Sequence, residues 1–268
     1  MRPVAPELTA ARELVVVPDR DLSSVPFAAL WDGRAGRYVV QAYPVRTLPS
    51  AGFVGAAGMA RHGVGGSALV VGDPAADTLA TRGAVALRGA AEEAAQVARL
   101  YARARLLVGA HADRRRVLAL LPSSSIFHFA GHAVANSEQP ELSYLALVAG
   151  GADDGLLRAR EIGALRLSHL GMVVLSACNT LGARATHAGP IAGLAYSFLR
   201  AGVPAMLSSL WDVNDDATTP LLVAFHRRAA GGMGAAEALR AAQLEALESD
   251  RPETRAPRVW AAFVYSGP

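Results

Sequence analysis

Runs of residues that are apolar at every position alternate along the chain with alanine-rich stretches whose apolar residues recur at helical spacing. Runs of the first kind are typical of strands buried on both faces, and stretches of the second kind predict helices. We expect strands over 14–17, 68–71, 105–108, 126–130, 172–176 and 205–210, an extended region over 38–45, and a strand or half of a hairpin over 144–148. We expect helices over 90–101, 113–120, 188–201, 215–230 and 235–247, a short connection over 155–162, and a tail over 251–268 that packs back. This alternation predicts an open, mainly parallel α/β sheet with helices on both faces.

The N-terminal part follows this alternation of strands and helices less closely, and a glycine-rich break at 63–67 separates it from the rest of the chain. We therefore divide the chain into an N-terminal β-rich segment, 1–66, and a core, 67–268. We expect the first segment to extend the same sheet, and a small subdomain of its own is the alternative.

Two of the predicted buried strands lead into residues that can work together chemically. Cys178, the only cysteine, follows the run that begins at Met172, and His132 follows the run that begins at Ile126. Ligands and chemistry in open α/β sheets gather beyond the carboxyl ends of the strands. An imidazole there can take the proton of a thiol, whose ordinary pKa is about 8.5, and so produce a nucleophile. The alternative interpretations are a buried structural cysteine and a loop histidine without a partner.

The residues around His132 favour a site that binds an oxyanion. Gly131 lets the backbone turn and approach another segment closely, and small Ala133 leaves its own N–H group accessible. The N–H groups of Ala133 and Cys178 are then candidate donors to a tetrahedral intermediate. We expect His128, inside the strand, to point into the packing or to bond a neighbour. With no third ligand evident, we predict no metal site and no cofactor.

The segment 208–216 leaves a predicted strand and enters a predicted helix. Trp211 lies at the mouth of the strand, where it can line a pocket, and Asp215 is a candidate helix N-cap. One interpretation is capping plus core packing. The other is a substrate groove whose acidic floor prefers a basic side chain.

Composition narrows the functional classes. The chain has 268 residues, 52% of them hydrophobic, and a formal net charge of +3, with arginine as the only basic residue besides histidine. The run 114–116 is the one tight basic cluster, which we interpret as a solvated helix start, so we expect no direct nucleic-acid partner. A single cysteine fits a reducing compartment. No apolar leader and no unbroken run of about 20 apolar residues is visible, so we expect a cytoplasmic protein without a membrane partner.

Several short blocks occur in an order that resembles a known family. The blocks are 14–19, 25–30, Leu87 with 92–93, 127–132, 154–157, 161–162, 174–180, 209–213 and 238–243. Together they are similar to the CHAT domains, which belong to the same cysteine-peptidase clan as caspases, metacaspases and separase. The resemblance runs over nearly the whole chain.

The resemblance implies a caspase-like α/β fold with His132 and Cys178 as a catalytic dyad, and an oxyanion site from backbone at Gly131, Ala133 and Cys178. It implies that a peptide substrate adds as a strand along 208–211. The candidate substrate-binding residues that follow from it are Asp153, Ser176, Ser208, Trp211, Asp212 and Asp215. It also implies a protein or peptide substrate, regulated proteolysis under a sensor or partner protein, and a role in bacterial signalling or defence.

Three features depart from the family pattern. Asn179 stands where an acidic residue is common, and Ala133 replaces the usual glycine after the histidine. No helical repeat precedes the domain, so we expect either a separate regulatory partner or a longer parent protein.

Two other functions compete with a cysteine endopeptidase. The first is a catalytically silent interaction module with the same fold. The second is another thiol enzyme, such as an acyl transferase or amidase, with a small closed pocket. Burial of 208–211 between strands on both sides would favour the second.

Overall fold

The computed structural model describes residues 8, 10–48, 51–52, 66–74, 87–136, 138–178, 193–213 and 215–267. It describes the backbone alone for Arg20, Asp21, Arg88, Cys178 and Asp215. The strands of the main sheet are β1 (Leu14–Val16), β4 (Val45–Thr47), β5 (Ser67–Pro74), β6 (Arg103–Gly109), β7 (Ile126–Val134), β8 (Tyr144–Ala146), β9 (Leu156–Arg158), β10 (Met172–Cys178), β11 (Ala205–Ser209) and β12 (Phe263–Ser266). A separate hairpin joins β2 (Trp31–Asp32) and β3 (Arg37–Tyr38).

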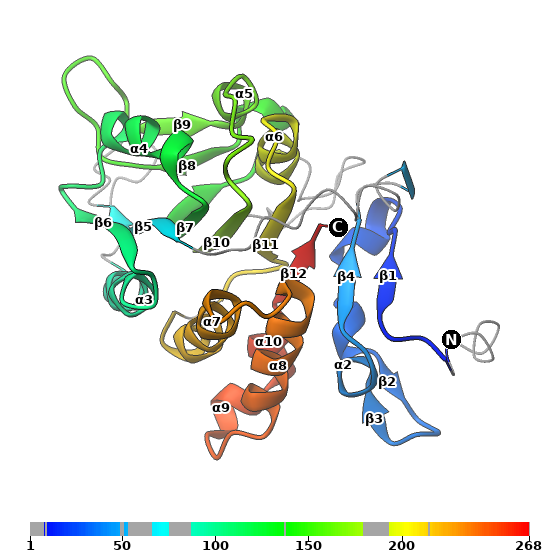
Figure 1. The fold of residues 1–268 in the computed structure, drawn as a ribbon. Helices are drawn as coiled ribbons and strands as arrows, with labels where there is room; N and C mark the ends of the chain where they lie inside the picture. The colour runs from blue at the N-terminus through cyan, green and yellow to red at the C-terminus, as the bar shows by residue number, and fades with distance from the viewer. Residues whose placement is uncertain are drawn as a thin grey trace.

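The order across the main sheet is β1-β4-β12-β11-β10-β7-β5-β6, with β8 and β9 attached at the end of β7 (Figure 1). The central pairs β5–β6, β5–β7, β7–β10 and β10–β11 are all parallel, whereas β12 runs antiparallel to β11. This mostly parallel α/β sheet confirms the predicted fold class. Parallel neighbours bring their carboxyl ends to one edge, which is where chemistry gathers in such sheets.

Helices cover both faces of this sheet (Figure 1). The helices are α2 (Val39–Ala42), α3 (Arg88–Ala98), α4 (Arg114–Leu120), α5 (Ala159–Ile162), α6 (Leu194–Arg200), α7 (Asp215–Ala230), α8 (Ala235–Leu247), α9 (Pro252–Arg255) and α10 (Pro257–Trp260). One core joins α3, α7 and α8 to alternate strand residues such as Val70 and Val174. A second core joins α4, α5 and α6 to the intervening residues, such as Val71 and Val173. This alternation explains why the central strands are apolar at every position.

The N-terminal strands continue the same sheet. The hydroxyl groups of Thr47 in β4 and Ser266 in β12 lie 2.6 Å apart, and Nη1 of Arg46 donates to the carbonyl oxygen of Gly267 at 3.0 Å. Tyr38 packs edge-on against buried Trp260, with ring centroids 5.2 Å apart. These contacts join the segment before residue 66 to the C-terminal tail, while the boundary itself stays a prediction.

Most predicted elements occur with shifted ends, and α7 and α8 match their predicted ranges. The side chain of Asp113 accepts from the backbone N–H of Arg116 at 2.9 Å, so Asp113 is the N-cap of α4. The prediction of an extended region over 38–45 was wrong in its middle, where the helix α2 forms. The guanidinium of Arg240 in α8 donates to carbonyl groups of this helix. The connection over 155–162 contains β9 and α5, and the predicted helix start at 188–192 lies outside the described residues.

Within the part of the chain that the structure describes, no helix combines the length and the apolar character that a membrane crossing requires.

Candidate catalytic site at the carboxyl edge of the sheet

Strands β7 and β10 are parallel neighbours, and their register pairs Cys178 with His132. Neighbouring strands lie about 4.8 Å apart, and paired residues occupy the same face of a sheet. The face is the one that α3 and α7 cover, because the even-numbered residues Ile126, Met172 and Val174 of these strands belong to that core. The backbone therefore brings the predicted nucleophile and base to one position at the carboxyl edge.

His132 lies inside β7, because this strand continues to Val134 instead of ending near Ala130 as expected. The reason is a non-local pairing, in which Ala133 and Val134 pair antiparallel with Leu145 and Tyr144 of β8. His132 is half-buried and Ala133 is buried. The histidine is thus fixed by strand structure on a continuous β7 rather than carried by a loop.

Gly131 stands where the backbone of β7 passes close to other groups. A Cβ atom at this position would lie 2.8 Å from Cδ of Pro74 and 3.0 Å from the Phe129 ring. Both distances are shorter than ordinary van der Waals contacts, so any larger residue has to displace β7 or its neighbours. Gly131 therefore allows the close backbone approach that we predicted from the sequence, here to Pro74 and Phe129.

We expect Gly131→Ala to lower the free energy of unfolding by about 1–3 kcal/mol, the usual effect of an overpacked core. The displaced strand also moves His132, so the reaction of Cys178 with a thiol reagent should slow. Urea unfolding and alkylation rates measure the two effects. Gly33→Ala is the matched control, because nothing lies within 4 Å of a Cβ atom there. An unchanged stability in Gly131→Ala would contradict the close approach.

Ser176 and Asp153, two predicted substrate-binding residues, lie in different settings. Ser176 is buried in β10 in register with Ala130. Oδ2 of Asp153 accepts from Nη1 of Arg114 at 2.7 Å, and its Oδ1 accepts from the N–H of Gly155 at 2.9 Å. Asp153 is not among the residues that line the cavity beside Trp211, so its carboxylate holds a turn and an arginine rather than joining that wall.

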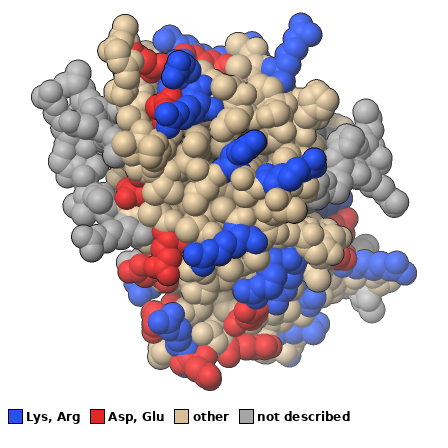
Figure 2. Space-filling model, turned by 60° about the vertical axis from the view of Figure 1, so that its left-hand side comes forward, with Lys and Arg blue, Asp and Glu red and all other residues tan. Residues whose placement is uncertain are grey.

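The basic run at 114–116 is largely engaged by the protein's own carboxylates. Arg114 forms ion pairs with Asp153 and Glu161, and Arg116 pairs with Asp113 at 3.1 Å. On the face drawn in Figure 2, arginines stand singly or in small groups between uncharged side chains, with acidic residues beside several of them.

Strand β11 has backbone partners on both sides. Ser208 is in register with Leu175 of β10 and with Val264 of β12, and it is buried. The N–H of Leu210 donates to the carbonyl oxygen of Ala262 at 2.7 Å. A peptide therefore cannot add as a strand at Ser208, which corrects the expected position of substrate pairing. The cause is the C-terminal tail, which returns as β12 and takes that edge.

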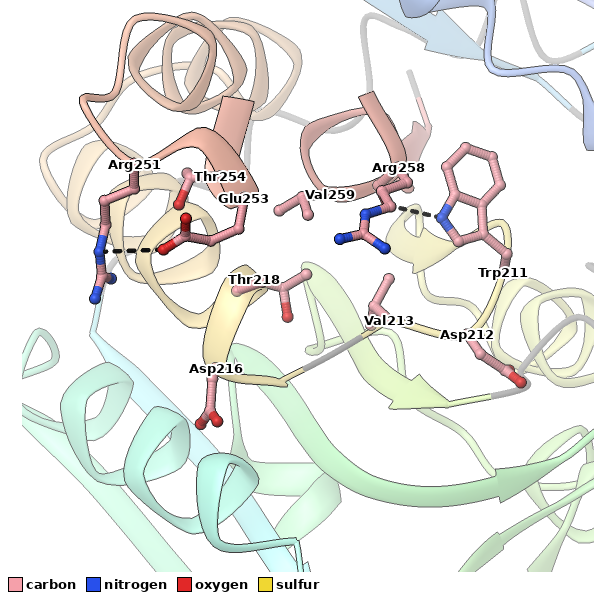
Figure 3. A pocket seen from close by; sticks show the side chains of 11 residues that line it. Trp211, Asp212, Val213, Asp216, Thr218, Arg251, Glu253, Thr254, Arg258 and Val259 are labelled. Carbon is pink, nitrogen blue, oxygen red and sulfur yellow. Dashed lines mark hydrogen bonds and ion pairs between the residues drawn. The ribbon is translucent and has the colours of Figure 1, made fainter. Parts of the chain in front are cut away.

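A cavity of about 450 Å³ begins where β11 ends, and we call it the Trp211 cavity (Figure 3). Its lining residues come from the segment after β11, the first turn of α7 and the helices α9 and α10: Trp211, Asp212, Val213, Asp216, Ala217, Thr218, Arg251, Glu253, Thr254, Arg258 and Val259. Nε1 of Trp211 donates to the carbonyl oxygen of Arg258 at 2.8 Å. The Trp211 cavity thus lies on the α7 side of the sheet, past the carboxyl end of β11.

The charge of the Trp211 cavity is mixed. Arg251 and Glu253 form a loose ion pair at 3.7 Å. In Figure 3 the Arg258 side chain reaches from α10 toward Val213, whereas the Asp216 carboxylate points away from the middle of the cavity. The acidic floor that the sequence suggested is therefore balanced by two arginines from the tail. The side chain of Asp215 lies outside the described residues.

His128 is fully buried, as expected for a residue that bonds a neighbour. Its Nδ1 lies 3.0 Å from Nε2 of His226, and its Nε2 lies 3.1 Å from Oε1 of Glu93. These partners could not be predicted from the sequence, because Glu93 and His226 lie on helices far from His128 along the chain. Among the described residues, no group of three or more His, Cys, Asp or Glu side chains is arranged to hold a metal ion.

Solved structures with the same arrangement define the fold. The chain is similar to separase in two structures of the separase–securin complex from Saccharomyces cerevisiae, with 15% identity and TM-scores of 0.59 and 0.57. Each comparison covers 95% of this chain, but the chain spans only 15% or 16% of the separase chain. A complex of the pro- and mature domains of RgpB from Porphyromonas gingivalis has 13% identity and a TM-score of 0.42 over 76% of this chain and 47% of that one. The two separase comparisons, with TM-scores above 0.5, show that this chain has the α/β fold found in separase.

The family follows from a separate comparison. The model of the CHAT domain matches residues 1–268, so the chain belongs to the CHAT domain family. No curated protein sequence matches the chain.

Proposed function

We propose that this CHAT domain is a cysteine endopeptidase that cleaves a protein substrate, with Cys178 as nucleophile and His132 as its base. The observation that carries the proposal is the register of β7 and β10, which pairs these two residues at the carboxyl edge of the sheet. The separase fold and the CHAT family support the same reaction class.

In the proposed reaction the Cys178 thiolate attacks the scissile carbonyl carbon, and the imidazolium of His132 protonates the leaving amine. Water then attacks the thioester, with His132 accepting its proton, and this step releases the acid product and restores the thiolate and the imidazolium. Backbone N–H groups at Cys178 and beside His132, near Gly131 and Ala133, are the proposed donors to the oxyanion. The Trp211 cavity and the exposed side chain of Asp212 are the proposed contacts for the substrate.

We also propose that the substrate pairs beyond the end of β11. The backbone of Ser208 is taken by β10 and β12, so the first segment open to an added strand begins at Trp211. A protein partner is the proposed regulator, because the similar separase structures are complexes with securin.

The enclosure of Ser208 also favours the second candidate function, a thiol acyl transferase or amidase with a closed pocket. Peptide libraries and small acyl thioesters separate the two functions. Cleavage of extended peptides supports the endopeptidase, and turnover of small acyl thioesters without peptide cleavage overturns it.

A peptide probe with a thiol-reactive end group tests the proposed centre directly. Because Cys178 is the only cysteine, every labelled molecule reports on that residue. We expect labelling to be selective over a small alkylating reagent and to slow about 10²–10⁴-fold in His132→Ala, the usual contribution of a general base. Equal labelling of wild type and His132→Ala, or no selectivity for the peptide, would identify a catalytically silent module.

A further inference from the structure

Four titratable side chains form a continuous buried chain beneath β7. The Tyr101 hydroxyl lies 2.7 Å from Nδ1 of His226, and Nε2 of His226 lies 3.0 Å from Nδ1 of His128. Nε2 of His128 then lies 3.1 Å from Oε1 of Glu93, an ion-pair distance at which the two atoms are not aligned for a hydrogen bond. We call these four side chains the buried relay. Thr219 completes it by donating to Oε2 of Glu93 at 3.3 Å.

The buried relay joins the two helices on this face to the strand that carries His132. Glu93 and Tyr101 come from α3 and the turn that follows it, His128 comes from β7, and His226 comes from α7. Glu93, His128 and His226 have no exposed surface, and Tyr101 has 7%. The relay is therefore a buried polar link between α3, α7 and β7.

Among the described residues, Glu93 is the one charged side chain that contacts His128 or His226. The residues in register with His128 are Val70 of β5 and Val174 of β10. On the packed helices, the charged side chains whose burial is described are exposed or partly exposed: Glu92, Asp216, Arg227, Arg228, Glu237, Arg240, Glu245, Glu253, Arg255 and Arg258. Glu93 is thus the one charged partner inside this core among the described residues.

The distances permit two complete proton arrangements that differ by one proton. Nε2 of His128 carries hydrogen in both, because a bare nitrogen lone pair 3.1 Å from Oε1 of Glu93 would face an oxygen lone pair. In the first, both rings are neutral, with Nε2–H of His226 donating to Nδ1 of His128 and the Tyr101 O–H donating to Nδ1 of His226. In the second, a proton from solvent makes His128 an imidazolium. Its Nδ1–H then donates to Nε2 of His226, and Nδ1–H of His226 donates to the Tyr101 oxygen.

We propose that the buried relay binds at most one proton, shared as a unit, and that this proton sets how α3 and α7 hold β7 and thereby His132. Uptake reverses every donor between Tyr101 and His128 while Glu93 keeps its partner. His128, His226 and Tyr101 are positioning residues here, since none of them lies at the paired Cys178–His132 position. The effect on His132 rests on the proposed function, whereas the shared proton does not.

The surroundings of His226 oppose a second proton. Burial, and then the charge of His128, hold the pKa of His226 well below its ordinary value. Below about pH 6.5 the unfolded chain binds two protons on these histidines, and the folded relay binds one at most. Unfolding therefore takes up protons, so stability is lost as the pH falls below about 6.5.

The linkage between pH and unfolding measures the shared proton. Between pH 6.5 and 5.5 we expect the unfolding equilibrium constant of the wild type to rise by about threefold to thirtyfold, the smaller value if the relay already holds its proton at pH 6.5. His226→Phe removes one titrating ring, so the slope should fall by about one proton. Phe225→Leu is the matched control, because Phe225 is equally buried on α7 but does not titrate, and it should keep the wild-type slope. An unchanged slope in His226→Phe would overturn the proposal.

Histidine ¹⁵N spectra of the wild type test the reversal without any variant. We expect His226 to stay neutral on acidification and to change its hydrogen from Nε2 to Nδ1, at the same midpoint at which His128 becomes charged. Two cationic rings in the folded protein, or a His226 tautomer that is the same at every pH while His128 titrates, would overturn the shared proton.

The coupling to His132 is read from Cys178 alkylation by the peptide probe between pH 5.5 and 8. In His226→Phe we expect the pH profile of the rate to lose the step at the relay midpoint, whereas Phe225→Leu keeps it. A wild type that never reacts selectively rejects the proposed function but leaves the linkage and ¹⁵N results standing. A selective wild type with identical profiles in both variants rejects the positioning role alone.

Discussion

Cys178→Ala is expected to abolish peptide cleavage by this domain, and His132→Ala is expected to lower kcat by about 10²–10⁴-fold. The first variant removes the sulfur that would form the thioester, for which no other cysteine can substitute. The second leaves the thiol without the base that lies in register with it on β7. Because nucleophile and base act as one unit, the double variant should be no worse than Cys178→Ala.

Cleavage rates with a peptide from the library, together with far-UV spectra to show folding, measure these effects. His169→Ala is the control for His132→Ala, since it removes an exposed histidine outside β7 and should leave the rate unchanged. If Cys178→Ala and His132→Ala both cleave as fast as the wild type, the paired position on β7 and β10 is not the catalytic centre.

The central sheet was predictable because its physical cause is local. Strands β7 and β10 are covered on both faces, so most positions in their sequences are apolar. This pattern can be recognised without knowing which helices cover the strands. The helices α7 and α8 matched their predicted ranges because the spacing of their apolar residues is regular. The strand pattern does not show that β7 and β10 are neighbours; the family resemblance implied it through the pairing of Cys178 with His132.

Features that depend on contacts between distant segments were not predictable. Nothing local in 251–268 shows that the tail supplies β12 to one side of β11 and Arg258 to the Trp211 cavity. The helix α2 forms inside a β-rich run because Arg240, far along the chain, donates to its carbonyl groups. The role of His226 could not be predicted for the same reason. Its hydrogen-bond partners, His128 and Tyr101, lie on distant segments of the chain.

The largest expected loss of stability comes from Trp260→Ala, which should lower the free energy of unfolding by about 3–5 kcal/mol. Trp260 is fully buried, packs edge-on against Tyr38, and donates from Nε1 to the carbonyl oxygen of Arg255 at 3.1 Å. Truncation leaves a large cavity between α10 and the N-terminal segment. It also leaves the Arg255 carbonyl without this donor.

Trp31→Ala provides a matched control on the opposite side of the same tyrosine. Trp31 packs edge-on against Tyr38 with ring centroids 4.9 Å apart, but its side chain is 58% exposed. An exposed aromatic contact contributes little beyond its small buried area, so we expect a loss of about 1 kcal/mol or less. Denaturant unfolding followed by circular dichroism measures both variants.

The shape of the unfolding curve adds a test of how the N-terminal segment belongs to the fold. Tyr38 and Arg46 join this segment to the C-terminal tail, so Trp260→Ala should shift one common transition for the whole domain. A wild type with two separate transitions, of which Trp260→Ala moves only one, would contradict a single cooperative sheet from β1 to β6. Equal losses in Trp260→Ala and Trp31→Ala would contradict burial as the cause.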